Sequence, residues 1–231
     1  MSQSIKYIIL GRMSYTRLPG KMLLKLNGKP LLWYSVNAII EHAGAENCIV
    51  ATSELDSDTP LYEYAKSLGI TCIRGSLNNV AQRFADAVTL SKADYCIRVC
   101  GDNVFVNHDL LKQFDAEIQK NEFDFISNTL ERSYPYGMSL EAVRSSVYLN
   151  SIKNFDNDKG DLEHVMPYLY RTELIKKHFI YNRKFPEGKG LQLAIDTKED
   201  FNKVDNILKQ LDKPYFDLSI GEIKQYFDKV K

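Results

Sequence analysis

The chain has 231 residues, and 44% of them are hydrophobic, which is enough for one large α/β core or two small ones. Lys plus Arg and Asp plus Glu both number 30, so the formal net charge is zero. This balance excludes a global electrostatic attraction to nucleic acid or to an anionic membrane. The N-terminal residues lack a basic region followed by a long apolar run, and the longest apolar runs are strand-sized. We therefore expect a cytoplasmic protein without a signal peptide or a membrane span.

Short apolar runs alternate with amphipathic segments in the first half of the chain. The expected strands are Ile5–Leu10, Cys48–Thr52, Ile70–Ile73 and Asp94–Val99. The expected helices are Pro30–Glu41, Pro60–Leu68, Val80–Leu90 and His108–Lys120. This order predicts parallel strands with helices on both faces of the sheet. The four cysteines, Cys48, Cys72, Cys96 and Cys100, lie in or at the end of strand-like runs, which favours free thiols.

The rhythm changes after about Asp124. The strands expected there are Phe123–Ser127, Ser139–Arg144, Phe179–Tyr181 and Leu191–Ile195. The expected helices are Leu162–Arg171, Thr197–Leu211 and Ile220–Val230. No linker, repeat or low-complexity tract interrupts the chain. We therefore predict a single domain, with a core formed by residues 1–123 and 191–231 and an inserted lobe at about 124–190.

A basic loop, Gly11–Lys21, directly follows the first expected strand and carries Arg12, Arg17 and Lys21. In open α/β sheets, ligands bind beyond the carboxyl ends of the strands. Backbone N–H groups and three cations at that place suit a polyphosphate. The loop is neither a Walker loop nor a dinucleotide fingerprint. Arg and Lys are common on protein surfaces, so the charge of the loop alone does not distinguish a phosphate-binding loop from a solvated basic loop without a ligand.

Two aspartates follow expected strands that are far apart in the sequence. Asp102 comes after Gly101 at the end of the fourth strand, and Asp196 follows Leu191–Ile195. Magnesium is usually held by one or two carboxylates together with phosphate oxygens and water. The pair therefore predicts a Mg²⁺ site, with a turn residue for Asp102 and a helix cap for Asp196 as the alternatives.

A polar and aromatic stretch between the strands of the second half can line a sugar site. It includes Asn128, Tyr134 and Glu141, although a hydrogen-bonded hairpin loop explains it equally well. His164 follows Glu163 in an expected helix, where a purely structural histidine is the alternative.

Taken together, these segments resemble the cytidylyltransferases of bacterial surface polysaccharide pathways, which include the spore-coat polysaccharide type and the CMP-Kdo and CMP-sialic acid synthetases. The resemblance runs in order from about residue 5 to 208. The stretches that carry it are Leu10–Leu23 (similar to A-R-x-x-S-x-R-L-P-G-K-x-L), Gly28–Leu31, Arg74–Ser76 with Val80 and Arg83, Arg98–Asp102 (similar to R-x-T-G-D), Ser127–Thr129, Tyr134–Pro135, Glu163–Val165 and Leu191–Phe201 (similar to D-T-P-E-D-F).

The resemblance implies a Rossmann-like nucleotide-diphospho-sugar transferase fold, with a mixed, mainly parallel sheet and a small inserted lobe for homodimer formation. A cluster of tyrosines in that lobe is of a type enriched at interfaces. The implied reaction transfers CMP from CTP to an acidic sugar or sugar-like acceptor, with Mg²⁺ as cofactor and release of pyrophosphate, for surface polysaccharide synthesis.

The resemblance also implies roles for individual residues. The nucleotide contacts are Leu10, Gly11, Arg12, Lys21, Arg74, Ser76, Arg83 and Asp102, of which Arg12, Lys21 and Asp102 are catalytic. The metal ligands are Asp102 and Asp196. The acceptor contacts are Tyr15, Asn128, Tyr134, Glu141 and His164.

Several positions depart from the family pattern. Gly11 replaces an alanine, Ser14-Tyr15 replaces a Gly-Ser pair, and Asn103-Val104 replaces Cys-Pro. We expect the Tyr15 ring to turn outward and wall the acceptor pocket. Two alternatives stay open: a sugar-1-phosphate nucleotidyltransferase that uses another NTP, and a non-catalytic nucleotide-binding regulator whose phosphate site Tyr15 fills.

Overall fold

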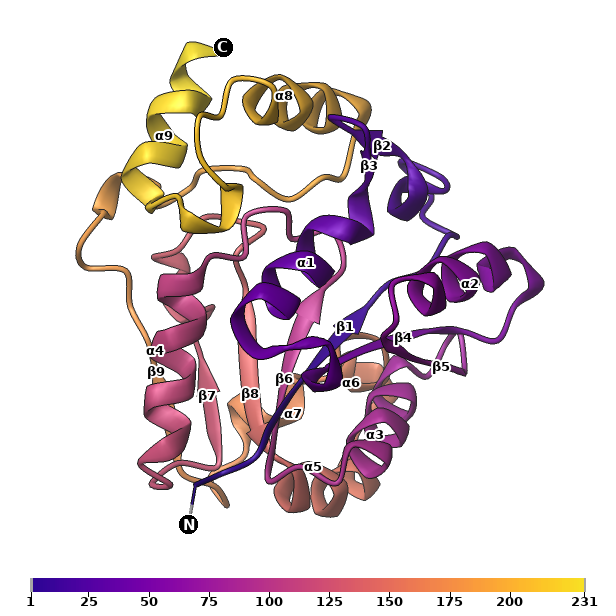
Figure 1. Ribbon diagram of the computed structural model, residues 1–231. Helices are drawn as coiled ribbons and strands as arrows, with labels where there is room; N and C mark the ends of the chain where they lie inside the picture. The colour runs from indigo at the N-terminus through magenta and orange to yellow at the C-terminus, as the bar shows by residue number, and fades with distance from the viewer. Residues whose placement is uncertain (1, 231) are drawn as a thin grey trace.

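The computed structural model describes residues 2–230, and a seven-stranded sheet in the order β5-β4-β1-β6-β8-β7-β9 runs through it (Figure 1). The strands are β1 (Ile5–Leu10), β4 (Cys48–Ser53), β5 (Thr71–Gly75), β6 (Tyr95–Cys100), β7 (Phe125–Ser127), β8 (Leu140–Arg144) and β9 (Lys177–Phe179), while β2 (Lys25–Leu26) and β3 (Lys29–Pro30) form a separate small sheet. Strands β1, β4, β5 and β6 are parallel. Strand β8 is antiparallel to both β6 and β7, so the sheet is mixed but mainly parallel, as predicted.

Helices cover both faces of the sheet because its central strands are apolar on both sides. In β1, Tyr7 and Ile9 belong to the core on one face, and Ile8 and Leu10 to the core on the other. The first face is covered by α1 (Leu31–Ala43), α2 (Thr59–Ser67) and α4 (His108–Gln119). The second is covered by α3 (Val80–Ser91), α5 (Ser145–Ser151), α6 (Asp161–His164) and α7 (Pro167–Arg171).

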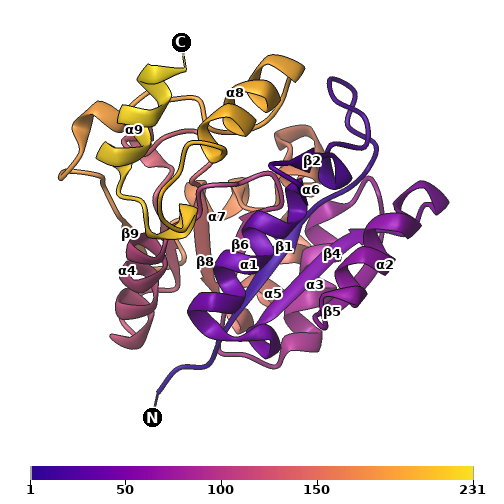
Figure 2. The same cartoon turned by 45° about the horizontal axis from the view of Figure 1, so that its top comes forward.

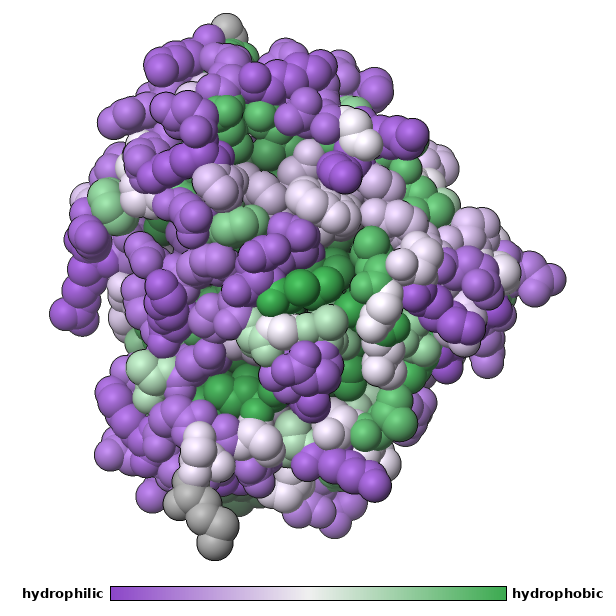
Figure 3. All heavy atoms as spheres, viewed as in Figure 1, coloured by the Kyte–Doolittle hydropathy of each residue, from purple (hydrophilic) through white to green (hydrophobic). Residues whose placement is uncertain are grey.

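The C-terminal helices extend the first core. They are α8 (Lys198–Leu208) and α9 (Ile220–Lys229), which pack against each other and lie above α1 in Figure 1. The 3₁₀ turns are Lys21–Leu23, Ala45–Asn47, Asp56–Asp58, Leu130–Arg132, Ile152–Asn154, Asn157–Lys159, Pro186–Gly188 and Tyr215–Asp217. Figure 3 shows hydrophilic side chains over α8 and α9 and more hydrophobic atoms near the middle of the same face. No helix within residues 2–230 is long and apolar enough to cross a bilayer.

The predicted strands and helices of the first half are confirmed to within about two residues. In the second half, the expected helix Leu162–Arg171 is wrong as one element, because it is divided into α6 and α7. Val165 lies between them with φ +72°, and Pro167 has no N–H to continue the first helix. Helix α5 was not anticipated, and β9 begins two residues earlier than the expected strand Phe179–Tyr181.

The expected strand Leu191–Ile195 is also wrong. Its alternate apolar side chains are buried, but the segment makes only an isolated bridge between Gln192 and Tyr136. The alternating apolar pattern therefore reflects the burial of one side of the segment. Such burial does not require hydrogen-bonded pairing with a neighbouring strand. The inserted segment 124–190 supplies β7, β8 and β9 to the same sheet as the core.

Asp58 anchors the loop that follows β1, which Figure 2 shows leading from β1 toward β2. Its side chain is fully buried, and its Oδ1 accepts a hydrogen bond from the backbone N–H of Met13 at 2.7 Å. Its Oδ2 accepts bonds from the Thr52 hydroxyl at 3.0 Å and from the Ser53 N–H and hydroxyl at 3.0 and 2.5 Å. The basic loop is thereby tied to the end of β4.

We expect Asp58→Ala to lower the free energy of unfolding by about 3 kcal/mol, because it leaves several buried donors without an acceptor. Chemical denaturation monitored by circular dichroism measures the change. The matched control is Asp56→Ala, because Asp56 is exposed in the same turn and should be nearly neutral. Equal stability of the two variants would contradict this role for Asp58.

Candidate active site

The candidate site lies at the carboxyl ends of β1 and β6, the two strands between which the connections reverse direction across the sheet. Such a switch point leaves a crevice in which α/β proteins bind ligands. The N–H of Gly101 donates to the carbonyl of Leu10 at 2.8 Å, which holds the two strand ends together. A Cβ at position 101 would lie 3.2 Å from that carbonyl oxygen, so glycine suits this close approach.

Lys21 joins the two predicted metal ligands. Its side chain is 1% exposed, and its Nζ lies 2.7 Å from Asp102 Oδ2 and 3.4 Å from Asp196 Oδ1. The same ammonium group donates to the carbonyl of Ile195 at 2.6 Å. Arg17, which is largely exposed, approaches the other oxygen of Asp196 at 3.1 Å. All three donors of the Lys21 ammonium are therefore engaged by protein oxygens.

The two carboxylates suit a divalent cation. Both lie within 3.4 Å of one point, the Lys21 Nζ, so the position between them already accommodates a positive charge. Within residues 2–230, no group of three His, Cys, Asp or Glu side chains could hold a metal ion. A hard cation with few protein ligands, completed by phosphate oxygens and water, fits a donor set of this kind.

Tyr15 covers this arrangement from the side of the cavity. The Lys21 Nζ lies 4.0 Å from the centroid of the Tyr15 ring, and the Arg12 guanidinium carbon lies 5.6 Å from it. Burial, followed by the charge of Asp102, raises the pKa of Tyr15 well above its usual value, so the hydroxyl stays neutral. The ring lies against the Lys21 ammonium group and lines the first cavity, whereas Lys21 does not line it.

Two cavities adjoin this centre on the face of the sheet that α3, α6 and α7 cover. The first cavity has a volume of about 210 Å³ and is lined by Leu10, Gly11, Arg12, Tyr15, Val80, Arg83, Arg98, Cys100, Asp102, Glu163 and His164. The second cavity has a volume of about 420 Å³ and is lined by Arg98, Cys100, Thr129, Arg132, Ser139, Glu141, His164, Met166, Pro167 and Tyr170. Because Arg98, Cys100 and His164 line both, the two cavities adjoin each other.

Arg83 is the most deeply buried cation of the first cavity. It is 2% exposed, and its Nη1 donates to the carbonyl of Ser76 at 2.8 Å, while its Nε is buried without a partner. Burial lowers its pKa, and the charge of the buried Asp58 partly opposes this shift, although the two side chains form no salt bridge. A buried guanidinium that forms no direct ion pair favours the binding of an anion.

His164 is presented to both cavities by a strained turn. Val165 has φ +72° and ψ −46°, values that a β-branched residue rarely adopts. The N–H of Met166 donates to the carbonyl of His164 at 2.8 Å, which closes a γ-turn. This is the rare and strained form, in which the central residue has a positive φ. Strain of this kind is concentrated at functional sites, and here it places the imidazole at the boundary of the two cavities.

Besides Lys21, which is held by the two aspartates, three predicted contacts that line neither cavity bond to nearby backbone groups. The guanidinium of Arg74 donates to the carbonyls of Ser53, Glu54 and Leu55. Ser76 accepts a bond from the N–H of Asn79. Asn128 donates to the carbonyl of Met138 and accepts from the N–H of Leu140, both at 2.8 Å. In the structure, these side chains shape the loops and the β7–β8 connection.

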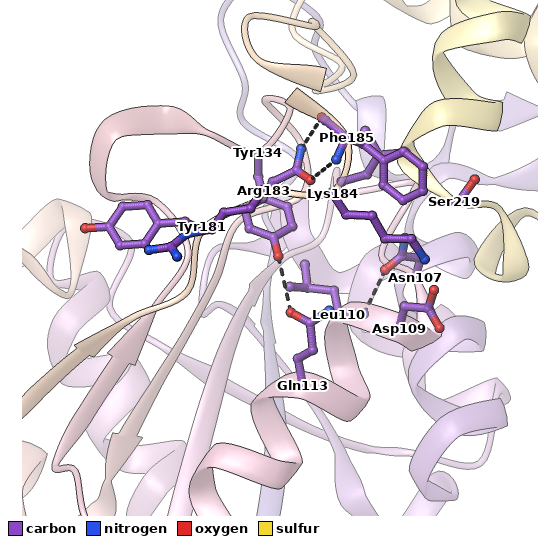
Figure 4. Close-up of a pocket in the computed structure, with 12 residues that line it drawn as sticks. Asn107, Asp109, Leu110, Gln113, Tyr134, Tyr181, Arg183, Lys184, Phe185 and Ser219 are labelled. Atoms are coloured by element: carbon purple, nitrogen blue, oxygen red, sulfur yellow. Dashed lines mark hydrogen bonds between the residues drawn. The ribbon is translucent and has the colours of Figure 1, made fainter. Parts of the chain in front are cut away.

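Tyr134 is likewise not brought to the cleft. It lines a separate pocket of about 260 Å³ near the start of α4, where its hydroxyl donates to Gln113 at 3.3 Å (Figure 4). The same view shows the Asn107 side chain bonded to the N–H of Leu110 as the cap of α4.

Sequence reasoning missed two polar residues of the cleft, Arg98 and Tyr170. Arg98 lies in the middle of β6, opposite Glu141 of β8. Tyr170 comes from α7, and its hydroxyl donates to Glu141 at 2.6 Å. Burial and the charge of Glu141 raise the pKa of Tyr170. Two signals for Arg98 are present in the sequence: it is a charge inside an apolar strand, and it is the first residue of the stretch similar to R-x-T-G-D.

Comparisons with known proteins identify relatives along nearly the whole chain. The family model described as cytidylyltransferase matches residues 7–223. The spore coat polysaccharide biosynthesis protein SpsF of Bacillus subtilis is 30% identical, covering 87% of this chain and 84% of that protein. A 3-deoxy-manno-octulosonate cytidylyltransferase of Pseudoalteromonas atlantica is 24% identical, covering 74% of this chain and 76% of that protein. The solved structure of a cytidylyltransferase from Leptospira borgpetersenii has a TM-score of 0.88 and 26% identity, covering 98% of this chain and 94% of that one.

We expect Lys21→Met to destabilise the protein by about 1–3 kcal/mol, because Asp102 and Asp196 then face each other without a cation. Millimolar Mg²⁺ should restore part of this loss by binding only the folded state, and should raise the melting temperature of the variant more than that of the wild type. Thermal unfolding with and without MgCl₂ measures both effects. Lys112→Met, at an exposed position of α4, is the control. An equal response of Lys21→Met and wild type to Mg²⁺ would refute the cation-site assignment.

Proposed function

This chain belongs to the cytidylyltransferase family, and from that membership and the geometry of the cleft we propose that it transfers CMP from CTP to an acidic, sugar-like acceptor. An acceptor oxygen forms a bond to the α-phosphorus as the bond from that phosphorus to the bridging oxygen breaks. The electron pair of the broken bond leaves with pyrophosphate. Such a reaction asks the protein mainly to position its substrates and to neutralise charge on phosphate oxygens.

The buried guanidinium of Arg83 is the observation that carries this proposal. It lies in the first cavity with Arg12, whose charge lowers its pKa further, and within residues 2–230 its only carboxylate influence is that of Asp58, with which it forms no salt bridge. A triphosphate supplies the missing negative charge. The backbone at Leu10 and Gly11 forms the adjoining wall, where the family resemblance places the cytosine ring. We therefore assign the first cavity to CTP.

Asp102 and Asp196 are the residues that would hold Mg²⁺. The ion supplies a Lewis acid charge to the phosphate when it is bound. Lys21 is held between the same two carboxylates in the free protein. In our proposal, its ammonium group moves from them to the phosphate oxygens when the nucleotide arrives, as the role implied for Lys21 requires.

The second cavity is the place for the acceptor. An ionised carboxylate or phosphate oxygen can attack without losing a proton, whereas a sugar hydroxyl must release one. His164 lies at the boundary of the two cavities, so in our proposal it takes that proton. The relatives that act in spore-coat polysaccharide synthesis and on 3-deoxy-manno-octulosonate support an acidic sugar as acceptor and a role in surface polysaccharide synthesis.

We also propose that two copies associate through residues 124–190. Among the tyrosines of this segment, Tyr136 is 41% exposed and is available to such an interface. Tyr148 is fully buried between α5 and α3 and supports the core instead.

We expect Asp102→Asn and Asp196→Asn each to lower turnover about a hundredfold or more, because each weakens charge stabilisation at the phosphate. The assay supplies Mg²⁺, acidic sugars and each of the four NTPs in turn, and measures pyrophosphate release and the CMP-linked product. Asp109→Asn, exposed at the start of α4, is the matched control. Release of pyrophosphate from another NTP in preference to CTP would favour a sugar-1-phosphate nucleotidyltransferase.

We expect Tyr15→Ser to bind CTP at least as tightly as the wild type, because the Tyr15 ring lines the first cavity and lies against Lys21, which does not line it. Its loss exposes the ammonium group to the triphosphate. Titration with CTP and acceptor kinetics in the same variant make the comparison. A wild type that binds CTP without releasing pyrophosphate, combined with turnover in Tyr15→Ser, would identify the ring as an obstruction and favour the regulator. CTP binding weakened more than tenfold would place the ring in contact with the nucleotide.

A further inference from the structure

The guanidinium of Arg98 lines both cavities and has hydrogen-bond donors that the protein leaves largely unused. Its Nη1 contacts Glu141 Oε2, and its Nη2 reaches only the sulfur of Cys100 at 3.3 Å. Its Nε is buried without any partner. A thiol sulfur is a weak acceptor, so the Nη2 edge of the fork has no strong partner within the described chain.

Glu141 holds Arg98 through one oxygen only. The second oxygen, Oε1, accepts the hydroxyl of Tyr170 at 2.6 Å. That hydroxyl also lies 2.6 Å from the Ser127 hydroxyl and 2.5 Å from the Thr129 hydroxyl. The carboxylate is 5% exposed and fixed from two sides, so it cannot turn to pair with both ends of the guanidinium. Arg–carboxylate pairs are frequently bidentate, and the second bond of such a pair is missing here.

The position of Arg98 on β6 determines the side of the sheet to which the Nη2 edge of its guanidinium faces. Side chains two apart on a strand lie on the same face, so Arg98 and Cys100 point to the same side of β6. Asp102 follows just beyond the end of the strand. Arg98 and Cys100 line both cavities, and Asp102 lines the first, so an anion at the Nη2 edge would lie beside the cavity in which phosphate transfer is proposed.

The charges of the second cavity favour an anion there. Arg98 and Arg132 contribute two cations against the single carboxylate of Glu141, which is already engaged by Arg98 and Tyr170. Hydroxyl and imidazole groups complete the lining, from Thr129, Ser139 and His164. A cavity with an open guanidinium edge beside such groups suits a small molecule that carries both a carboxylate and hydroxyl groups.

We propose that Arg98 is the residue that selects an acidic acceptor, by binding the acceptor's carboxylate at its Nη2 edge while Glu141 and Tyr170 hold the guanidinium in place. This inference rests on the proposed function, because it assigns the second cavity to the acceptor. It adds a specificity-determining residue on β6, outside the loop that follows β1.

The test compares equilibrium binding of glucuronate and glucose, which differ in one carboxylate, to the free protein. We expect the wild type to prefer glucuronate by about tenfold or more, the scale of one charge-assisted hydrogen bond. The paired variant Arg98→Met with Glu141→Gln removes both charges, so no buried charge is left alone, and it should bind the two sugars equally. Arg98→Lys keeps the charge without the fork and should show a smaller preference than the wild type.

Arg144→Met is the matched control, because Arg144 is an ion-paired arginine of the same sheet that lines neither cavity. It should keep the preference for glucuronate. Absence of the preference in the wild type, or its survival in the paired variant with folding confirmed by circular dichroism, would overturn the inference. The binding test needs no CTP. A preference that depends on Arg98 in a protein that releases no pyrophosphate from CTP would therefore support the inference and refute the proposed function.

Discussion

The buried ammonium group of Lys21 is the contact on which the arrangement of the site depends. It draws together the loop after β1, the end of β6 and the segment before α8, which are far apart in the sequence. Two carboxylates at this distance repel each other, and a buried pair that loses one partner is strongly destabilised. The lysine therefore does in the free protein what a bound cation does in a loaded site: it allows Asp102 and Asp196 to face the same point.

The cleft beside this centre has two halves that are built differently. The first cavity is lined largely from loop and helix ends, with Arg12 and Tyr15 on the loop after β1 and Arg83 in the first turns of α3. The floor of the second cavity is the sheet itself, where Arg98 and Glu141 are directly opposite each other on β6 and β8. Both halves lie on one face of the sheet, because Arg98 and Cys100 of β6 line both of them. The strained turn at the end of α6 presents His164 between them.

Much of the fold could be predicted, because parallel strands covered on both faces are apolar throughout and the helices between them are amphipathic. The strand-end position of Asp102 was predictable for the same reason. Arg98 belongs to the stretch similar to R-x-T-G-D, but its role was not predictable. That role depends on which residue of β8 lies opposite, and pairing register across a long connection leaves no local trace. The motifs around Arg74 and Asn128 matched the family, yet their side chains bond backbone groups, since a motif does not distinguish a contact with ligand from support of a loop.

The antiparallel insertion of β8 beside β6 also bears on how such a protein can change. The residues proposed to read the acceptor lie on β6, β8 and α7, whereas those proposed to hold the nucleotide phosphates lie on the loop after β1 and on α3. Substitutions on β8 or α7 can therefore reshape one pocket while the other keeps its form. A lineage built on this sheet can diversify the molecules it activates without having to reinvent how it handles its nucleotide.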